Sequence, residues 1–173
     1  NSFKQLAETD PPMWRAGPGC QMEQLAQAGL SQFSALPERQ TLAEWLAGAA
    51  AAAWPPGRGE ASGVYSADAL LADGTSATFG PFGATGQRLC AWTMQRLVPA
   101  LFQLAQGEKA RLCRTQPDWP GRYRLDALLP ESAAGVNLAH LLCGHGGTLV
   151  WLEHVVLFAV SPISTRRALP PST

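Results

Sequence analysis

The sequence predicts an α+β fold in a single domain that spans residues 1–173. A chain of 173 residues has the usual size of one domain, and 46% hydrophobic against 15% charged residues is enough apolar material for a packed core. Apolar residues recur at helical spacing up to about residue 106, and at a spacing closer to two beyond residue 110. We therefore expect N-terminal helices and one long central helix packed on a mainly antiparallel sheet.

The N-terminal region contains many residues that interrupt regular structure. They separate short apolar pieces and are Pro11, Pro12, Gly17, Pro18, Gly19 and Pro37. This composition predicts an irregular arm over about residues 1–20, followed by one short helix from about Gln21 to Ala28.

A capping box predicts the start of the next helix. The Thr41 side chain can accept a hydrogen bond from the third helical N–H, while Glu44 returns to the threonine N–H. Leu42, Trp45 and Leu46 then fall on one helical face and precede an alanine run. We expect this helix to end by Trp54, because the proline pair at 55–56 cannot continue it.

A β-hairpin is predicted next. Residues 64–71 and 75–79 flank Asp73-Gly74, and Asp-Gly is a strong signal for a tight hairpin turn. Glycines and Pro81 then interrupt the chain, and Thr85 could cap a long helix that runs to about Gln106.

The long predicted helix carries a stripe of apolar residues. Steps of four and three relate its members, Cys90, Met94, Leu97, Leu101 and Leu104, which is the spacing of a buried helical face. Val98 and Phe102 widen the stripe, and Pro99 is expected to kink the helix. We expect this to be the central core helix.

The remainder of the chain predicts strands over residues 111–114, 123–128, 137–142 and 148–160, separated by prolines and by the glycines of 144–147. The last strand is apolar on both faces, as expected of a central strand. A helical interpretation of residues 149–160 stays open, since short apolar runs do not separate the two. Residues from about 162 to 173 are expected to form a short tail.

All three histidines lie close to Cys143 in the sequence. His140, Cys143, His145 and His154 are residue types that bind zinc, and a hairpin through the glycine-rich turn could bring some of them together. Strand alternation argues against it, since His140 and Cys143 would face opposite sides. The competing hypothesis is that these are turn and core residues whose polar atoms are satisfied locally.

The same residues suggest a possible enzyme. Cys143 could be a nucleophile with His145 or His154 as its base, and Cys90 is a second candidate near a predicted helix start. The alternative for both thiols is a buried hydrophobe. No cofactor is expected, because no nucleotide, kinase or metalloprotease motif is present in the sequence.

A glycine-rich connection suggests a possible anion site. Gly83, Gly86 and Arg88 join a predicted strand to a predicted helix start, where backbone N–H groups could hold a phosphate or carboxylate. The spacing matches neither a dinucleotide fingerprint nor a P-loop, so an ordinary connection is the alternative.

Six tryptophans are many for this length, and Trp14, Trp54 and Trp119 lie beside or close to prolines in predicted loops. Rigid aromatic side chains in loops are good anchors for a partner protein. The alternative is that they cap the edges of the domain's own core.

These observations favour a non-enzymatic protein–protein interaction or assembly module that presents an apolar, aromatic surface to another protein or to a second copy of itself. Thirteen basic residues balance thirteen acidic ones, so no net field favours nucleic acid. The longest apolar run falls short of a bilayer span, and a cytoplasmic location is expected. The alternative is a Cys/His-based enzyme, with or without a metal ion, centred on Cys143, His145 and His154.

Overall fold

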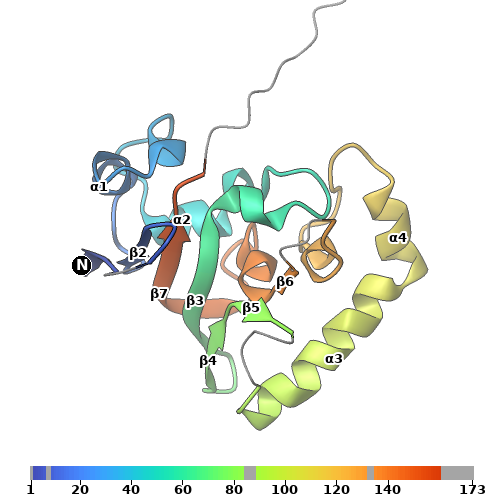
Figure 1. The fold of residues 1–173 in the computed structure, drawn as a ribbon. Helices are drawn as coiled ribbons and strands as arrows, with labels where there is room; N and C mark the ends of the chain where they lie inside the picture. Colours follow the sequence, from blue (N-terminus) through green and yellow to red (C-terminus); the bar gives the residue numbers. More distant parts are fainter. Residues whose placement is uncertain (1, 7–8, 84–88, 132–134, 161–173) are drawn as a thin grey trace, which may run out of the picture.

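An antiparallel five-stranded sheet organises the computed structural model, which describes residues 2–6, 9–83, 89–131 and 135–160 (Figure 1). The strand order is β1-β2-β7-β3-β4, and a separate small sheet pairs β5 with β6. The strands are β1 Phe3–Gln5, β2 Met13–Ala16, β3 Val64–Leu71, β4 Ser76–Phe79, β5 Pro81–Phe82, β6 Val136–Asn137 and β7 Val150–Phe158. The fold is therefore α+β, as the sequence predicted.

The N-terminal arm is part of the sheet, so the expectation of an irregular segment over residues 1–20 was wrong. β1 pairs with β2, and β2 pairs in turn with β7, with Met13 opposite Phe158. Trp14 and Ala16 alternate into the core along β2 and are buried. Pro11 and Pro12 fall between β1 and β2, and Pro18 follows β2, so none of them interrupts a strand. The predicted helix at 21–28 is confirmed as α1, Met22–Gln27.

The capping box at Thr41 is confirmed. The Glu44 N–H donates to Thr41 Oγ1 at 3.3 Å, and the Thr41 N–H donates to the Glu44 carboxylate at 2.8 Å. The helix α2 is shorter than predicted, Leu42–Ala47, because its last carbonyls have partners elsewhere in the chain. Gly144 and Gly146 donate their N–H groups to the carbonyls of Leu46 and Ala47, both at 2.8 Å.

The alanine run after α2 forms a 3₁₀ turn, η2 Ala49–Ala52, in place of the predicted helical extension to Trp54. A second 3₁₀ turn, η3 Gly59–Ser62, precedes β3, and another, η1 Ser31–Phe33, follows α1. High helix propensity did not decide the geometry of the alanines, because the tertiary cap had already ended the helix at Gly48.

The predicted hairpin and central strand are confirmed. β3 and β4 pair around a tight turn in which the Gly74 N–H donates to the Leu71 carbonyl at 3.0 Å. β7 lies between β2 and β3, which excludes the helical interpretation of this segment. The pairing of β7 with β3 contains a bulge, in which Glu153 is an extra residue on β7. As a result, Leu152 and Val155 both point into the core while Glu153 stays exposed.

The long helix is α3, Trp92–Gln106. It runs along the edge of the molecule toward α4, rather than through the centre (Figure 1), and it packs on the segment at residues 125–128. Met94, Val98 and Ala105 are its buried residues, whereas Leu104, a member of the predicted buried stripe, is 61% exposed. Pro99 lies inside the helix, and Thr85 lies outside the described residues.

Three of the strands predicted for the C-terminal half were wrong. Residues 111–114 belong to the helix α4, Glu108–Arg114, and residues 123–128 contain the 3₁₀ turn η4, Leu125–Leu128. Residues 138–142 form the 3₁₀ turn η5, Leu138–Leu142, because the Asn137 side chain accepts from the Ala139 N–H and caps it. Apolar runs this short are compatible with either periodicity.

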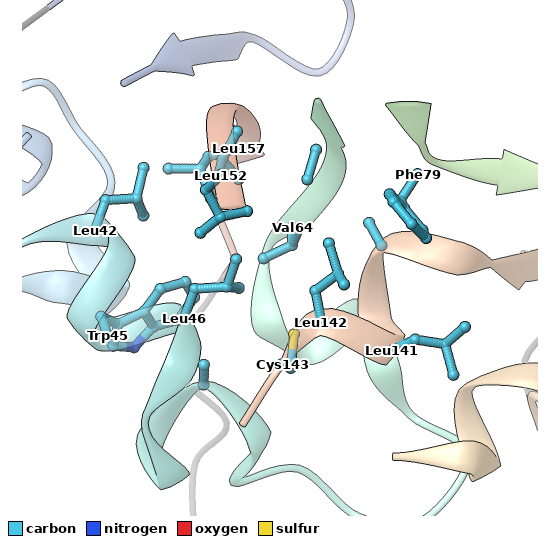
Figure 2. Packing of buried hydrophobic residues seen from close by; sticks show 14 of the residues in the cluster. Leu42, Trp45, Leu46, Val64, Phe79, Leu141, Leu142, Cys143, Leu152 and Leu157 are labelled. Atoms are coloured by element: carbon cyan, nitrogen blue, oxygen red, sulfur yellow. The ribbon is translucent and has the colours of Figure 1, made fainter. Parts of the chain in front are cut away.

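The core lies between the sheet and the helical segments. Figure 2 shows α2 side chains, Leu42, Trp45 and Leu46, beside Val64 of β3 and the β7 leucines 152 and 157. Phe33 packs edge-on against Trp45, with ring centroids 4.8 Å apart. No helix in the described part of the chain combines the length and apolar character needed to cross a bilayer.

A buried ion pair joins two irregular segments of this core. Arg124 and Asp126 are 3% and 1% exposed, and two parallel hydrogen bonds of 2.7 and 3.0 Å connect them. The Nη1 group of Arg124 donates to the carbonyls of Ala52 and Trp54, and the Gly57 N–H donates to Asp126 at 2.8 Å. The guanidinium also lies 3.4 Å from the centroid of the Trp54 ring.

We expect Asp126→Ala to lower the free energy of unfolding by about 3–5 kcal/mol, because it leaves a buried guanidinium without its counter-charge. Urea denaturation measures the change. A matched control is Asp68→Ala, which breaks the Arg15–Asp68 ion pair; those side chains are 37% and 32% exposed, so the expected loss is about 1 kcal/mol or less. Equal losses in the two variants would contradict a central role for the buried pair.

Candidate functional site

The structure does not gather the predicted Cys/His cluster into one site. Cys143 ends η5 in the core, His140 lies within η5, His145 lies in the glycine-rich turn, and His154 lies on β7 near Ser2. Among the residues that the structure describes, no group of three or more His, Cys, Asp or Glu side chains could hold a metal ion. The metal hypothesis therefore gains no geometric support.

Cys143 has the properties of a core thiol. Burial raises its pKa to about 12, an effect that outweighs the opposing contributions of Ser62, Arg124 and Trp54. A thiol with this pKa is protonated at neutral pH and is a poor nucleophile. The geometry therefore favours the buried-hydrophobe alternative for this residue.

The side chains of His140 and His145 are both buried, and burial makes the protonated form of each imidazole less favourable. Burial lowers the pKa of His140, although its ring nitrogen Nε2 lies 3.0 Å from the Val64 carbonyl. The ring packs so closely on Gly59 that a Cβ there would lie 2.3 Å from Nδ1. Burial also lowers the pKa of His145.

The predicted anion site can be followed only in part. Gly83 has φ +131°, a conformation that favours glycine, but Gly86 and Arg88 lie outside the described residues. The anion-binding role of these residues stays a prediction.

The tryptophans expected to anchor a partner are mostly internal. Trp14 lies in strand β2 and not in a loop, whereas Trp54 lies in a bend as predicted; they are only 8% and 5% exposed, which favours the alternative that they belong to the domain's own core. Their role in partner binding stays a prediction. Trp119 is half-buried, and its indole N–H donates to the Tyr123 carbonyl at 3.0 Å. The exposed rings are instead Trp92 and Trp151, at 68% and 75%.

Among the described residues, an apolar groove of about 510 Å³ lies between α3 and the end of the sheet. One wall is the α3 face that carries Leu97, Leu101 and Leu104. The other parts come from the β3–β4 hairpin, the segment around η4, η5 and the start of β7, which contribute Leu71, Phe79, Tyr123, Leu125, Leu141, Leu142, Leu149 and Val150. We refer to it below as the leucine groove.

The leucine groove explains what the predicted helical stripe does. Leu97, Leu101 and Leu104 share one face of α3, but that face turns toward the groove, while Met94 and Val98 turn into the core. Val98 and Phe102 widen the apolar surface of α3 beyond one buried face, and this width leaves Leu97, Leu101 and Leu104 free to line the groove. The groove residues from η4 and η5 were missed because those segments were assigned to strands.

Polar contacts brace the groove at two places. The Thr93 hydroxyl on α3 donates to Asp73 in the β3–β4 turn at 2.7 Å, and this bond is the main reason that the Asp73 pKa is lowered. The Tyr123 hydroxyl lies 3.1 Å from the Thr148 hydroxyl. The first contact ties α3 to the β3–β4 turn, and the second ties the segment before η4 to the start of β7, so polar contacts made by lining residues fix the walls of the groove.

Comparison of the chain with protein-family models, with curated proteins and with solved structures found no match.

The buried histidines give the fold a pH dependence. An unfolded histidine titrates near pH 6.5, whereas the folded pKa values of His140 and His145 are lower, so the unfolded state binds more protons between the two values. We expect the free energy of unfolding to be highest above pH 7 and to fall as the pH drops below about 6.5, by at most about 1.4 kcal/mol per pH unit for each histidine. Urea denaturation from pH 7.5 to 5.5 measures this slope, and His140→Asn or His145→Asn should reduce it.

We expect Cys143 to resist alkylation in the native protein at neutral pH, because its thiol is buried and protonated. Iodoacetamide labelling followed by peptide mass spectrometry tests this. Labelling should appear once urea unfolds the chain. Preferential labelling of native Cys143 would instead support the Cys/His enzyme hypothesis.

Proposed function

We propose that this protein is a non-enzymatic interaction module whose leucine groove receives an amphipathic helix of a partner protein. The observation that carries the proposal is the unfilled apolar groove itself. A persistent apolar concavity on a folded protein is costly in water and usually marks an interaction site.

The geometry of α3 favours a helical occupant. Leu97, Leu101 and Leu104 stand at positions i, i+4 and i+7, a row of about 10 Å along the helix axis. Such a row matches the side-chain ridges of a second helix, which would bring its own apolar residues at the same spacing. Leu104 and Tyr123, 61% and 39% exposed, stand where a partner could cover them.

The lining also indicates how the partner would be held. Asp73 is the one charged residue among the described side chains of the groove, and it is engaged with Thr93. The affinity would therefore come from apolar burial, with little dependence on salt and a negative heat-capacity change. A partner helix with one apolar face that carries no charged side chains fits this surface.

The alternative of a Cys/His-based enzyme has less support. Cys143 is a protonated core thiol, and its nearest histidines in the sequence, His140 and His145, line two different clefts. A nucleophile needs a base within hydrogen-bond reach and access to a substrate.

A designed amphipathic peptide of about 15 residues, with leucines at i, i+3, i+4 and i+7, is a suitable probe, since that length begins to support an isolated helix. We expect Leu104→Glu to weaken its binding at least about tenfold in fluorescence anisotropy, because a charge then enters the apolar contact. Leu112→Glu is the matched control: Leu112 is also 61% exposed on a helix, but lies outside the groove lining. It should leave the affinity unchanged.

Two outcomes would contradict the proposal. Equal binding by the Leu104 and Leu112 variants would place the peptide elsewhere. Concentration-dependent dimerisation in light scattering, abolished by Leu104→Glu but not by Leu112→Glu, would show that a second copy of the chain occupies the groove instead.

A further inference from the structure

A second cleft, of about 400 Å³, lies on another side of the β7 start. Its walls come from residues 18–19, from the beginning and end of α2, from the glycine-rich turn and from β7. Among its lining residues are His145, Thr41, Gly147 and the exposed Trp151. We refer to it as the His145 cleft.

The His145 ring contains a buried donor with no acceptor. The Leu149 N–H donates to Nδ1 at 3.4 Å, which assigns the proton of the neutral ring to Nε2. The residue is only 2% exposed, and Nε2 has no hydrogen-bond partner among the described residues. A buried polar group left unpaired costs about 1–3 kcal/mol, so a native fold that keeps one calls for an explanation.

The surrounding turn holds the ring in this state. Gly146 donates to the Ala47 carbonyl at 2.8 Å, and the Thr148 hydroxyl donates to the His145 carbonyl at 2.6 Å. Gly146 and Gly147 have φ values of +66° and +73°, which other residues rarely adopt. The glycine-rich turn therefore fixes the imidazole against the cleft through the backbone.

We propose that the His145 cleft binds a neutral amide, whose carbonyl oxygen accepts the unpaired Nε2–H while its apolar part packs on Trp151. The lining carries no acidic or basic side chain other than His145 itself, so an ionised ligand would lose its hydration without gaining a counter-charge. An amide carbonyl supplies an acceptor without a charge. Nε2 is buried, so a ligand reaches it only if a lining side chain moves; Trp151, which is 75% exposed, can change rotamer without disturbing the core.

The amide could belong to a small molecule or to the backbone of a peptide, and two probes separate these sources. N-methylacetamide carries the amide alone, whereas Nα-acetyl-leucine-N-methylamide adds a second peptide group and an aliphatic side chain. Tighter binding of the second probe assigns the cleft to a peptide segment. Equal binding assigns it to a small amide.

Nuclear magnetic resonance of ¹⁵N-labelled protein follows the binding. We expect either probe to shift the His145 Nε2 and Trp151 indole resonances together. His145→Phe keeps a ring and removes the donor, and it should weaken binding about tenfold, read at the indole of Trp151. Trp151→Ala changes an exposed residue, so it should fold normally and also weaken binding, read at His145.

The matched control is Trp92→Ala, which removes another ring that is 68% exposed but lies outside this cleft. The Trp92→Ala variant should bind both probes with the same affinity as the unmodified protein. The proposal is overturned if neither probe moves the His145 resonance, if Trp92→Ala weakens binding as much as Trp151→Ala, or if a water molecule occupies Nε2 and neither probe displaces it. These outcomes are independent of the leucine groove, since Leu104→Glu should leave probe binding here unchanged.

Discussion

The Arg124–Asp126 pair is the interaction on which the arrangement of the helical layer depends. Much of that layer consists of short 3₁₀ turns and irregular backbone, which cannot satisfy their own carbonyl and N–H groups. The Arg124 guanidinium donates hydrogen bonds to the carbonyls of Ala52 and Trp54, and the Asp126 carboxylate accepts one from the Gly57 N–H. Two segments separated by about seventy positions are thereby fixed to one another, with the Trp54 ring stacked on the cation.

The Arg124–Asp126 pair also helps to position one wall of the leucine groove. Tyr123 and Leu125 stand directly beside Arg124, so the pair fixes the part of the wall that η4 contributes. The opposite wall, α3, is tied to the β3–β4 turn through Thr93 and Asp73. Polar contacts made by Thr93, Asp73 and Tyr123, which themselves line the groove, therefore fix its two walls relative to the rest of the fold. A partner would then bind a surface that is already organised.

The start of β7 connects the two proposed sites. Val150 lines both the leucine groove and the His145 cleft, and the glycine-rich turn before it positions Leu149 on one side and His145 on the other. The same turn closes α2 by donating to its last carbonyls. One short segment thus completes a helix, presents a histidine and contributes to an apolar wall, which explains why it contains glycines with positive φ.

Local chemistry in the sequence determined the α2 start and the hairpin at Asp73-Gly74, because a cap and a tight turn each specify structure within a few residues. The apolar run of β7 predicted a strand, but only the pairing of β7 between β2 and β3 excluded a helix. The spacing of Leu97, Leu101 and Leu104 also predicted one apolar helical face, but only the tertiary structure decided that this face lines a groove. The N-terminal strands, the 3₁₀ turns and the Arg124–Asp126 network depend on partners far away in the sequence. Short apolar runs fit either periodicity, and the long-range hydrogen bonds and burial that choose between them exist only once the chain has folded.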